Sequence, residues 1–504
     1  MRRVLLLAAA LLSIAPAHAA PAATPAGCKY VKIAELPVRF QGANFAPTVA
    51  GSINGQPATL LVDTGSFASL LTPAAVDKYE LIQRYTGRHA EGIGGTSRLY
   101  GARVKEFGIG PTHSKGMNLD ILGDLGFTPE FDAIVGADFL FQADIEISLT
   151  EHALRFFRPL ECPPDSFLAY WTKDAVIVPL TGALDSSKNN TFTVELNGVK
   201  LDAIIDTGAT FTTVFESAAR KAGVKADHAS SRAGGTAVGV GSERVTQRSA
   251  VFTTFAIGGE TIREAELKIA PDNGRTGVDM LLGADFLRSH RVLFAMSQRQ
   301  LYINYLGGEV FARDSRAIPP WLQQEADSGN PDALLTLANI YAKGVQVPRD
   351  VAKATALLEQ AAAKDHPAAI LQLAEQRMRS RRYFEAATLY GRAQAARPDE
   401  RRTWLMLYLA RLHAGEPARA NTDLAERLAA DSKRAWPAPV GEFFLGRIDA
   451  AGLLALANKE EDSARPRRCQ ARAYMAMLAG ARGDTALAAS LNAERAADCK
   501  ADAR

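Results

Sequence analysis

The sequence of 504 residues lacks an excess of charge of either sign and lacks the motifs of most hydrolases. Its 58 Lys and Arg are nearly matched by 55 Asp and Glu, and the formal net charge is only +3. Nothing in this balance favours binding to nucleic acid, which requires a concentrated basic face. The eight histidines are scattered, and no H-E-x-x-H, G-x-S-x-G, G-x-G-x-x-G or G-K-[ST] segment occurs. We therefore expect no metal, no organic cofactor and no nucleic acid partner.

Long hydrophobic runs are also scarce, and the one that stands out lies at the N-terminus. Arg2 and Arg3 precede an apolar stretch over residues 4–15, and a small-x-small segment ends at Ala19. This pattern is typical of a secretory signal, and the run is shorter than the roughly 20 residues that span a bilayer. An N-terminal anchor that stays uncut is the alternative. We expect a cleaved signal, no transmembrane segment, and a periplasmic or secreted mature chain.

Cysteine is rare, and none of the four residues forms a C-x-x-C pair, which excludes zinc ribbons and thioredoxin motifs. An even number of cysteines in an exported chain favours disulfides. A bond between Cys28 and Cys162 would bracket one domain, and one between Cys469 and Cys499 would close a helical hairpin, but the sequence leaves the connectivity open. A lipid anchor on Cys28 is an alternative, although Pro25 stands where Leu would be expected.

The composition changes sharply after Pro319-Pro320. Glycine and alternating apolar residues dominate from about 30 to 308, which favours strands, whereas Ala, Leu, Arg and Glu dominate afterwards, which favours amphipathic helices. The expected organisation is a signal peptide 1–19, a linker 20–29, a first β-lobe 30–165, a second β-lobe 166–308, a linker 309–320 and a helical domain 321–504.

The strand region contains an internal duplication. Five landmarks recur in the same order with offsets of 143 to 148 residues, which chance similarity between glycine-rich loops does not produce. The recurring pairs are Asn54-Gly55 with Asn197-Gly198, Asp63-Thr64-Gly65-Ser66 with Asp206-Thr207-Gly208-Ala209, Gly92-Ile93-Gly94 with Gly239-Val240-Gly241, Phe107-Gly108-Ile109-Gly110 with Phe255-Ala256-Ile257-Gly258, and Gly136–Leu140 with Gly283–Leu287. The sequence therefore predicts two copies of one β-domain of about 130 residues.

Asp63 and Asp206 each follow an apolar run, where a buried strand breaks into a tight turn. A single Asp-Thr-Gly is a weak signal, because Asp and Gly are ordinary turn residues. Two copies at matched positions can meet across a pseudo-twofold axis. Two adjoining carboxyls cannot both ionise cheaply, so they share a proton and supply a base and an acid at the same pH. Such a pair can activate one water molecule.

The residues that follow each aspartate suit such a pairing. Gly65 and Gly208 have no Cβ, so the backbone can turn sharply and approach the partner loop. Thr64 and Thr207 can hydrogen-bond across the pair and hold the two loops in register. We therefore expect these four residues to support the two carboxyl groups.

These motifs resemble the retropepsin-like aspartic proteases, with two copies in one chain as in the bilobal pepsin-like enzymes. The resemblance covers about residues 30 to 308 and includes a second motif, apolar-apolar-Gly-Ala-Asp, at 134–138 and 281–285. It implies that Asp63 and Asp206 are the catalytic pair. We expect Asp138 and Asp285 to be structural, capping the short helices that follow.

The same resemblance implies a glycine-rich flap in each copy, at Gly92-Ile93-Gly94 and at Gly239-Val240-Gly241. Closure of the flaps over a substrate would exclude water. Neither presumed tip holds a Tyr, so both look retroviral in style. A plain surface hairpin is the alternative.

The tail has a period of 36 residues, which is typical of stacked helical hairpins. It resembles Sel1-like repeats over about 326 to 376 and tetratricopeptide repeats from about 381. Such arrays present a concave surface to peptides or proteins, although they can also simply brace the lobes. The residues that recur are Ala333, Leu337 and Ala338, at Ala369, Leu373 and Ala374.

Together these features predict an all-β bilobal aspartic protease followed by an all-α helical-repeat domain. The expected function is that of an exported aspartic endopeptidase acting on extended polypeptides, with a possible protein partner on the repeats. A monomer is expected, because one chain holds both lobes. The alternatives are a periplasmic binding or scaffold protein with inactive lobes, and a latent enzyme whose residues 20 to 40 or whose tail fill the cleft.

Overall fold

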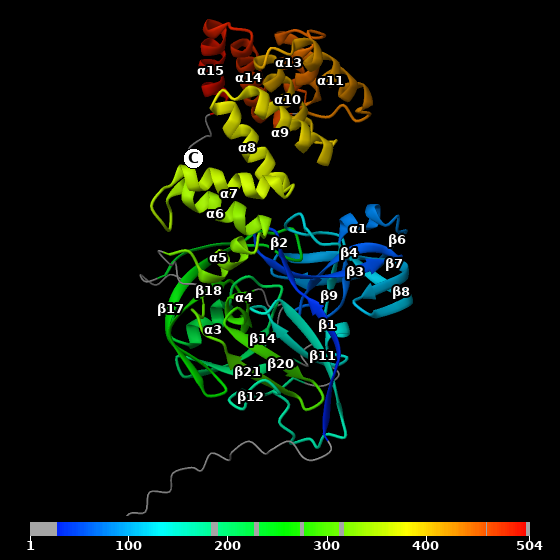
Figure 1. Cartoon of the computed structure of the whole chain (residues 1–504), viewed down its shortest axis with the longest axis vertical. Helices are drawn as coiled ribbons and strands as arrows, with labels where there is room; N and C mark the ends of the chain where they lie inside the picture. Colours follow the sequence, from blue (N-terminus) through cyan, green and yellow to red (C-terminus); the bar gives the residue numbers. More distant parts are fainter. Residues whose placement is uncertain are drawn as a thin grey trace, which may run out of the picture. The chain divides into compact units, whose positions relative to one another are not determined.

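The computed structural model describes residues 28–182, 190–225, 231–272, 277–311, 317–459 and 461–499. The chain forms two compact units, Met1–Asp314 and Ser315–Arg504. In Figure 1 the first runs from blue to green and is rich in strands, and the second, from yellow-green to red, is helical. The expected signal peptide 1–19 and most of the linker 20–29 lie outside the described residues. No helix among the described residues is long and apolar enough to cross a membrane.

The first lobe is built on an eight-stranded sheet with the order β2-β3-β4-β9-β5-β8-β7-β6. The hairpin between β3 and β4 turns at Asn54 and Gly55, whose φ angles of 52° and 78° are left-handed, as the Asn-Gly signal predicts. The elements of this lobe are β2 (Arg39–Gln41), β3 (Ala46–Ile53), β4 (Gln56–Val62), β5 (Leu70–Leu71), α1 (Pro73–Lys78), β6 (Gln83–Gly92), β7 (Gly95–Ile109), β8 (Thr112–Leu122), β9 (Ala133–Val135) and α2 (Ala137–Leu140).

The second lobe repeats this topology in a seven-stranded sheet with the order β13-β14-β19-β15-β18-β17-β16. Each of its seven strands occupies the place of a counterpart in the first lobe, and among the described residues β2 is the strand of the first lobe without a counterpart. The duplication read from the sequence is thus a duplication of the fold. The elements are β13 (Phe192–Leu196), β14 (Val199–Ile205), β15 (Thr213–Phe215), α3 (Glu216–Lys221), β16 (Arg232–Ala237), β17 (Val245–Ile257), β18 (Glu260–Ala270), β19 (Met280–Leu282) and α4 (Ala284–Leu287).

A third sheet of six strands is shared by the two lobes, which the sequence did not indicate. Its order is β1-β11-β10-β20-β21-β12, so strands of both lobes meet at the pairing of β10 with β20. There Ile145 pairs with Phe294 and Ile147 pairs with Val292. Because Val292 and Phe294 are the duplicates of Ile145 and Ile147, this register places a pseudo-twofold axis between the two strands. The strands are β1 (Lys29–Pro37), β10 (Asp144–Ser148), β11 (Ala153–Leu160), β12 (Val176–Pro179), β20 (His290–Ala295) and β21 (Gln300–Tyr305).

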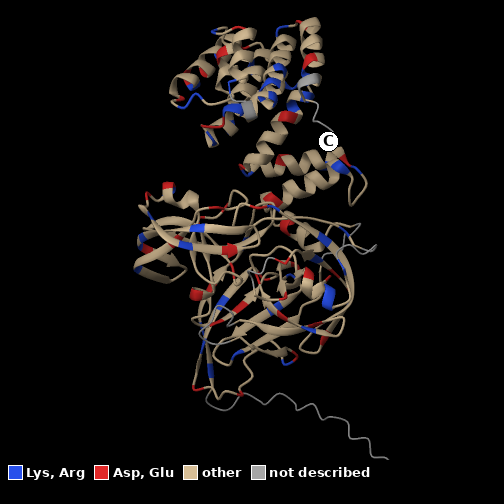
Figure 2. Cartoon of the chain, turned by 180° about the vertical axis from the view of Figure 1, so that it is seen from behind, with Lys and Arg blue, Asp and Glu red and all other residues tan. Residues whose placement is uncertain are grey.

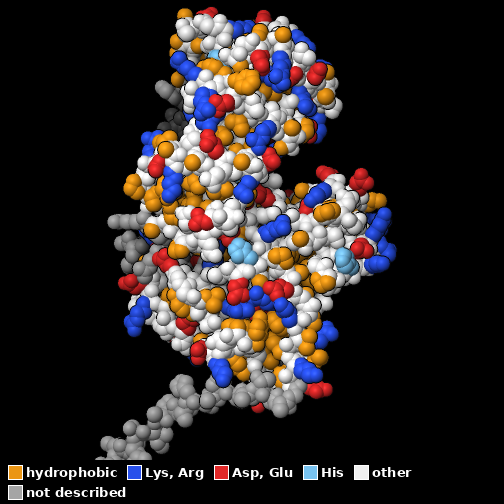
Figure 3. All heavy atoms as spheres, viewed as in Figure 1, with side chains coloured by type: hydrophobic (Ala, Val, Ile, Leu, Met, Phe, Trp, Pro, Cys, Tyr) orange, Lys and Arg blue, Asp and Glu red, His pale blue; other side chains and the backbone are white. Residues whose placement is uncertain are grey.

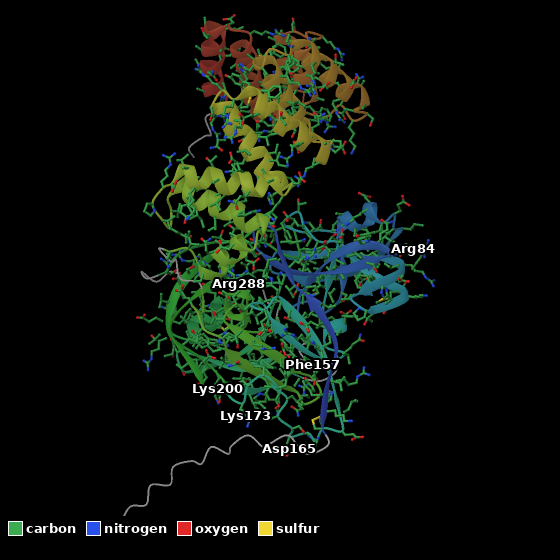
Figure 4. The ribbon with its side chains drawn as sticks, viewed as in Figure 1. Arg84, Phe157, Asp165, Lys173, Lys200 and Arg288 are labelled. Atoms are coloured by element: carbon green, nitrogen blue, oxygen red, sulfur yellow. A yellow bond between two sulfur atoms is a disulfide. The ribbon has the colours of Figure 1, made fainter. Side chains whose placement is uncertain are left out.

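The N-terminal strand β1 is held at the edge of this shared sheet. It pairs with β11 along its whole length, and the ring of Tyr30 stacks on Phe157, labelled in Figure 4, with centroids 4.8 Å apart. A disulfide joins Cys28 to Cys162, which settles the connectivity that the sequence left open, so Cys28 has no free thiol for a lipid. The described part of the segment 20 to 40 therefore lies in a sheet rather than in the cleft of a latent enzyme.

The second unit consists of helices that pack against their neighbours in sequence. The predicted period is visible in α6 and α8, which begin 36 residues apart at Pro331 and Pro367, and the predicted bond between Cys469 and Cys499 ties α14 to α15. The helices are α5 (Pro320–Asp327), α6 (Pro331–Lys343), α7 (Val351–Ala363), α8 (Pro367–Arg379), α9 (Tyr383–Ala396), α10 (Arg401–His413), α11 (Pro417–Ala430), α12 (Ala438–Phe444), α13 (Ala450–Ala457), α14 (Glu461–Ala481) and α15 (Thr485–Cys499).

Charges of both signs are interspersed over the two units (Figure 2). The space-filling view likewise shows acidic and basic side chains next to one another on the face that it presents (Figure 3). This distribution agrees with the near balance of 58 basic and 55 acidic residues.

Candidate active site

The two Asp-Thr-Gly loops leave equivalent strands of the two lobes and meet at the pseudo-twofold axis. Asp63 follows β4, and Asp206 follows β14. Each strand pairs in parallel with the strand of the second motif, β9 or β19. The amide of Asp63 donates to the carbonyl of Val135 at 3.0 Å, and that of Asp206 donates to Leu282 at 2.8 Å. The second motif therefore fixes where each aspartate leaves its strand.

The threonines lock the two loops together. The amide of Thr64 donates to Oγ1 of Thr207 at 3.0 Å, and the amide of Thr207 donates to Oγ1 of Thr64 at 3.1 Å. Each hydroxyl in turn donates to a carbonyl of the opposite lobe, Thr64 to Ile205 at 2.7 Å and Thr207 to Val62 at 2.6 Å. Both threonines are 1% exposed. The network is reciprocal, as the predicted contact across the pair required.

The glycines allow the loops to approach. A Cβ built on Gly65 would lie 2.4 Å from Cγ of Asp206, and one on Gly208 would lie 2.6 Å from Oδ2 of Asp63. Real Cβ atoms do not come so close to a carboxyl group, so any side chain at either position would push the carboxyls apart.

The two carboxyl groups are held in matching orientations. Oδ1 of Asp63 accepts from the amides of Gly65 at 3.0 Å and Ser66 at 2.9 Å. Oδ1 of Asp206 accepts from the amides of Gly208 at 2.9 Å and Ala209 at 3.0 Å. The carboxyl groups themselves are within hydrogen-bonding reach of each other. The sequence-predicted pair is thus brought together at one site.

The surroundings of the two aspartates raise the pKa of both carboxyl groups, that of Asp206 more than that of Asp63. Removal from water raises the pKa of Asp63, and its hydrogen bonds only partly oppose this. Burial likewise raises the pKa of Asp206 well above its ordinary value, and repulsion from the Asp63 carboxylate adds to the effect. The pair therefore titrates as a unit and shares one proton, with one carboxyl group ionised and the other protonated between its two pKa values.

The capping expected of Asp138 and Asp285 is found only in part. The N-cap positions of α2 and α4 are Gly136 and Gly283, which have no side chain to donate or accept. Each carboxylate nevertheless accepts from the next amide in the first turn, that of Phe139 at 2.9 Å and that of Phe286 at 3.0 Å. Oδ1 of Asp138 also accepts from the hydroxyl of Ser69 at 2.7 Å, and Oδ1 of Asp285 accepts from that of Thr212 at 2.7 Å.

The two acids beyond the pair are therefore braces for the aspartate loops. The hydroxyls of Ser69 and Thr212 accept from the amides of Gly136 and Gly283, both at 3.1 Å. Each chain of hydrogen bonds links a short helix to the segment after an Asp-Thr-Gly loop. Burial raises the pKa of Asp285 to about 6.

The presumed flap segments of the two lobes contact each other. Gly92 and Gly95 close the hairpin between β6 and β7, with Ile93 and Gly94 at its turn. The carbonyl of Gly94 accepts from the amide of Glu243 at 2.9 Å, just beyond the segment at 239–241. A Cβ built on Gly241 would lie 2.1 Å from the Gly94 oxygen. These are therefore not plain surface hairpins.

Each tip also packs on the opposite lobe. Ile93 lies against an apolar cluster of the second lobe that contains Phe215 and Leu281. Val240 lies against a cluster of the first lobe that contains Leu61 and Ile134. Both clusters contain strand residues that lead into the aspartate loops, Leu61 in one and Ile204 in the other, so each tip occupies an apolar position beside the aspartate loop of the opposite lobe.

Two features of the site escaped sequence reasoning. Asn190, which is 3% exposed, donates from Nδ2 to the carbonyl of Thr64 at 3.0 Å. Its counterpart in the first lobe is Pro47, so the duplication gave no signal for it. The segment at 124–126 also contacts the second flap, since the amide of Gly126 donates to Gly239 at 3.2 Å and that of Gly241 donates to Asp124 at 3.2 Å.

Nothing in the described parts of the chain gathers three or more His, Cys, Asp or Glu side chains into a metal-binding group. At the aspartate pair, two carboxyl groups of unequal acidity lie next to each other. Such an arrangement suits general acid and base catalysis of hydrolysis.

Comparison with known proteins bears on the two lobes. The aspartyl protease family matches residues 49–139 and 192–286. A solved structure of an aspartic proteinase from Irpex lacteus is 14% identical with a TM-score of 0.34, and the match covers 54% of this chain and 97% of that one. No curated protein matches. Each β-lobe is thus similar to the aspartyl protease family over a region that contains one of the two facing Asp-Thr-Gly loops.

Proposed function

We propose that the chain is an exported aspartic endopeptidase in which Asp63 and Asp206 form the catalytic pair. The observation that carries the proposal is the pair of carboxyl groups within hydrogen-bonding reach, each fixed by two backbone amides and joined through a reciprocal threonine network. The two disulfides suit an oxidising compartment outside the cytosol.

The chemistry follows from the unequal acidity of the pair. A water molecule between the carboxyls gives a proton to ionised Asp63 and attacks the carbonyl carbon of the scissile peptide. Protonated Asp206 donates to the carbonyl oxygen, which forms a neutral tetrahedral diol. The diol then collapses as the proton held by Asp63 passes to the leaving nitrogen, and Asp206 recovers its proton from a diol hydroxyl. Atoms and charges balance, and no covalent enzyme intermediate forms.

The substrate in this proposal is an extended polypeptide bound beneath the flaps. It enters when Ile93 and Val240 leave the apolar clusters that they now cover. Substrate side chains then take their places, which favours cleavage between apolar residues. Backbone pairing with the flap edges adds affinity without adding sequence preference.

The direct test is incubation of the full chain with an unfolded polypeptide in water enriched in ¹⁸O. We expect internal cleavages and one ¹⁸O atom in each new C-terminal carboxylate, measured by mass spectrometry. A well-folded chain that binds the polypeptide but cleaves nothing at any pH would instead favour a scaffold with inactive lobes.

The pH dependence of cleavage follows from the raised pKa values. Activity needs Asp63 ionised and Asp206 protonated, so the rate should rise as the pH passes the pKa of Asp63 and fall as it passes the higher pKa of Asp206. Both limbs should lie above the ordinary carboxyl value of 3.8. A profile of kcat/KM with its acid limb below that value would contradict this assignment.

A further inference from the structure

A pocket of about 700 Å³ opens in the helical unit between α8, α9, α10 and α14. Along α10 it is lined by Arg402, Met406, Leu409 and His413, which lie on one face of the helix at helical spacing. These positions span 11 residues, or about 16 Å. That length accommodates about five residues of an extended chain.

Most of the pocket wall is apolar and adaptable. Met378, Met406 and Met477 come from three different helices, and Leu409 and Tyr474 lie among them. Methionine side chains fill irregular gaps and suit surfaces that accept more than one apolar side chain. The pocket therefore fits a run of apolar groups without demanding one particular shape.

The tyrosine on α9 gives the pocket an unsatisfied polar group. Tyr390 lines it and is 1% exposed, and its hydroxyl has no hydrogen-bond partner within the described structure. Glu375, Arg402, Arg379 and Tyr474, which act electrostatically on this hydroxyl, also line the pocket. A buried hydroxyl without a partner costs about 1–3 kcal/mol. A ligand that offers an acceptor to it would recover that cost.

The charge beside Tyr390 is positive. Arg402 pairs with Glu375 at 2.9 Å, so these two charges offset each other. Arg379 lies exposed at the end of α8, and no ion pair of its side chain is found in the described part of the chain. Among the described residues, a positive charge without an ion-pair partner and a hydroxyl without a hydrogen-bond partner therefore belong to the lining of an apolar pocket. Together they complement a single carboxylate next to apolar side chains.

We propose that this pocket binds the C-terminal end of a polypeptide whose last residues are apolar, with its terminal carboxylate at Arg379 and the Tyr390 hydroxyl. The proposal rests on the proposed function for its source of ligand. Cleavage between apolar residues, as the clusters beside the aspartate pair favour, leaves a fragment that ends in an apolar residue and a free carboxylate. The helical unit would then hold one product of the reaction.

The experiment measures binding separately from cleavage. The full chain carrying Asp63→Asn and Asp206→Asn is titrated into a fluorescent Ala-Val-Leu-Met-Leu peptide with a free C-terminus, and into the same peptide with a C-terminal amide. We expect the free acid to bind at least about tenfold more tightly than the amide, a difference near 1.4 kcal/mol.

Variants test the residues that make the pocket. Arg379→Gln and Tyr390→Phe should each weaken binding of the free acid about five- to twentyfold. Arg397→Gln, an exposed arginine outside the pocket, is the matched control and should not change it. Tyr390→Phe removes only a hydroxyl without a partner, so the melting temperature should not fall and a loss of binding cannot reflect unfolding.

Three results would overturn the proposal. The first is that the free acid and the amide bind equally well. The second is that neither Arg379→Gln nor Tyr390→Phe weakens binding of the free acid. The third is that neither peptide binds. Binding that requires removal of residues 500–504 would also overturn it, because the chain's own end would then be the occupant. If the free acid binds as expected but the unmodified chain cleaves no polypeptide, the proposed endopeptidase activity is wrong and the proposed binding pocket is supported.

Discussion

Replacement of either member of the pair, by Asp63→Asn or Asp206→Asn, should lower kcat/KM for peptide cleavage by at least about 10³-fold. An amide at position 63 cannot accept a proton from water, and an amide at position 206 cannot supply one to the carbonyl oxygen. General acid and general base catalysis each contribute roughly 10²- to 10⁴-fold. The measurement is the initial rate with an internally quenched peptide at the pH optimum of the unmodified chain.

The same variants provide their own folding control. The raised pKa of Asp206 means that its ionisation opposes the folded state: stability is greatest below the unfolded value of 3.8 and declines as pH rises through the folded pKa. Asp206→Asn removes this penalty, so it should melt at a higher temperature than the unmodified chain at neutral pH. The difference should shrink toward acidic pH.

Equal cleavage by all three proteins would show that the activity resides elsewhere in the preparation. An inactive variant that also melts well below the unmodified chain would contradict the account of the buried pair. A loss of activity together with a gain in stability is the result that distinguishes a catalytic carboxyl from a structural one.

Gly65→Ala should have an effect of similar size for a steric reason. The new Cβ would lie 2.4 Å from Cγ of Asp206, so the loops must separate and the carboxyls lose their common water. We expect a loss of at least about 10²-fold in kcat, as misplacement of catalytic groups by about 1 Å can produce. The melting temperature of Gly65→Ala should also fall, because the two loops can no longer pack closely against each other.

Gly391→Ala is the matched control for this substitution. Gly391 lies within α9, where a Cβ would meet nothing within 4 Å. Alanine is also the better helix former by about 1 kcal/mol. This variant should keep full activity and melt no lower than the unmodified chain. If Gly65→Ala behaves in the same way, the two loops do not meet as described.

The meeting of the two aspartate loops can be predicted from the sequence because of the duplication. A single Asp-Thr-Gly segment is a weak signal, but two at matched positions are a strong one. The matched offsets of Asp63 and Asp206 predict that their loops face each other, and two facing loops need the threonines and glycines that follow each aspartate. The pairing of Cys28 with Cys162 and of Cys469 with Cys499 was favoured by position alone and is found in the structure.

Other features could not be predicted, because they depend on how the copies pack rather than on either copy. The contact of Asn190 with the Thr64 carbonyl is not repeated in the first lobe, where a proline stands at the equivalent position, so the duplication could not predict it. The crossing of Ile93 and Val240 into opposite lobes requires the relative position of the sheets. The N-cap position expected for Asp138 and Asp285 belongs to the glycine before each short helix, although each carboxylate still accepts from an amide in the first turn.

The shared sheet has a consequence for synthesis. Its strands include β1 at the beginning of the first unit and β21 near its end, and β12 pairs with β21 alone among the strands described. A nascent chain must therefore be almost 305 residues long before this sheet can close, and a fragment that ends before Asp206 carries only one of the two acids. Under the proposed mechanism a fragment that carries only Asp63 lacks the facing carboxyl group, so by itself it should not cleave peptides.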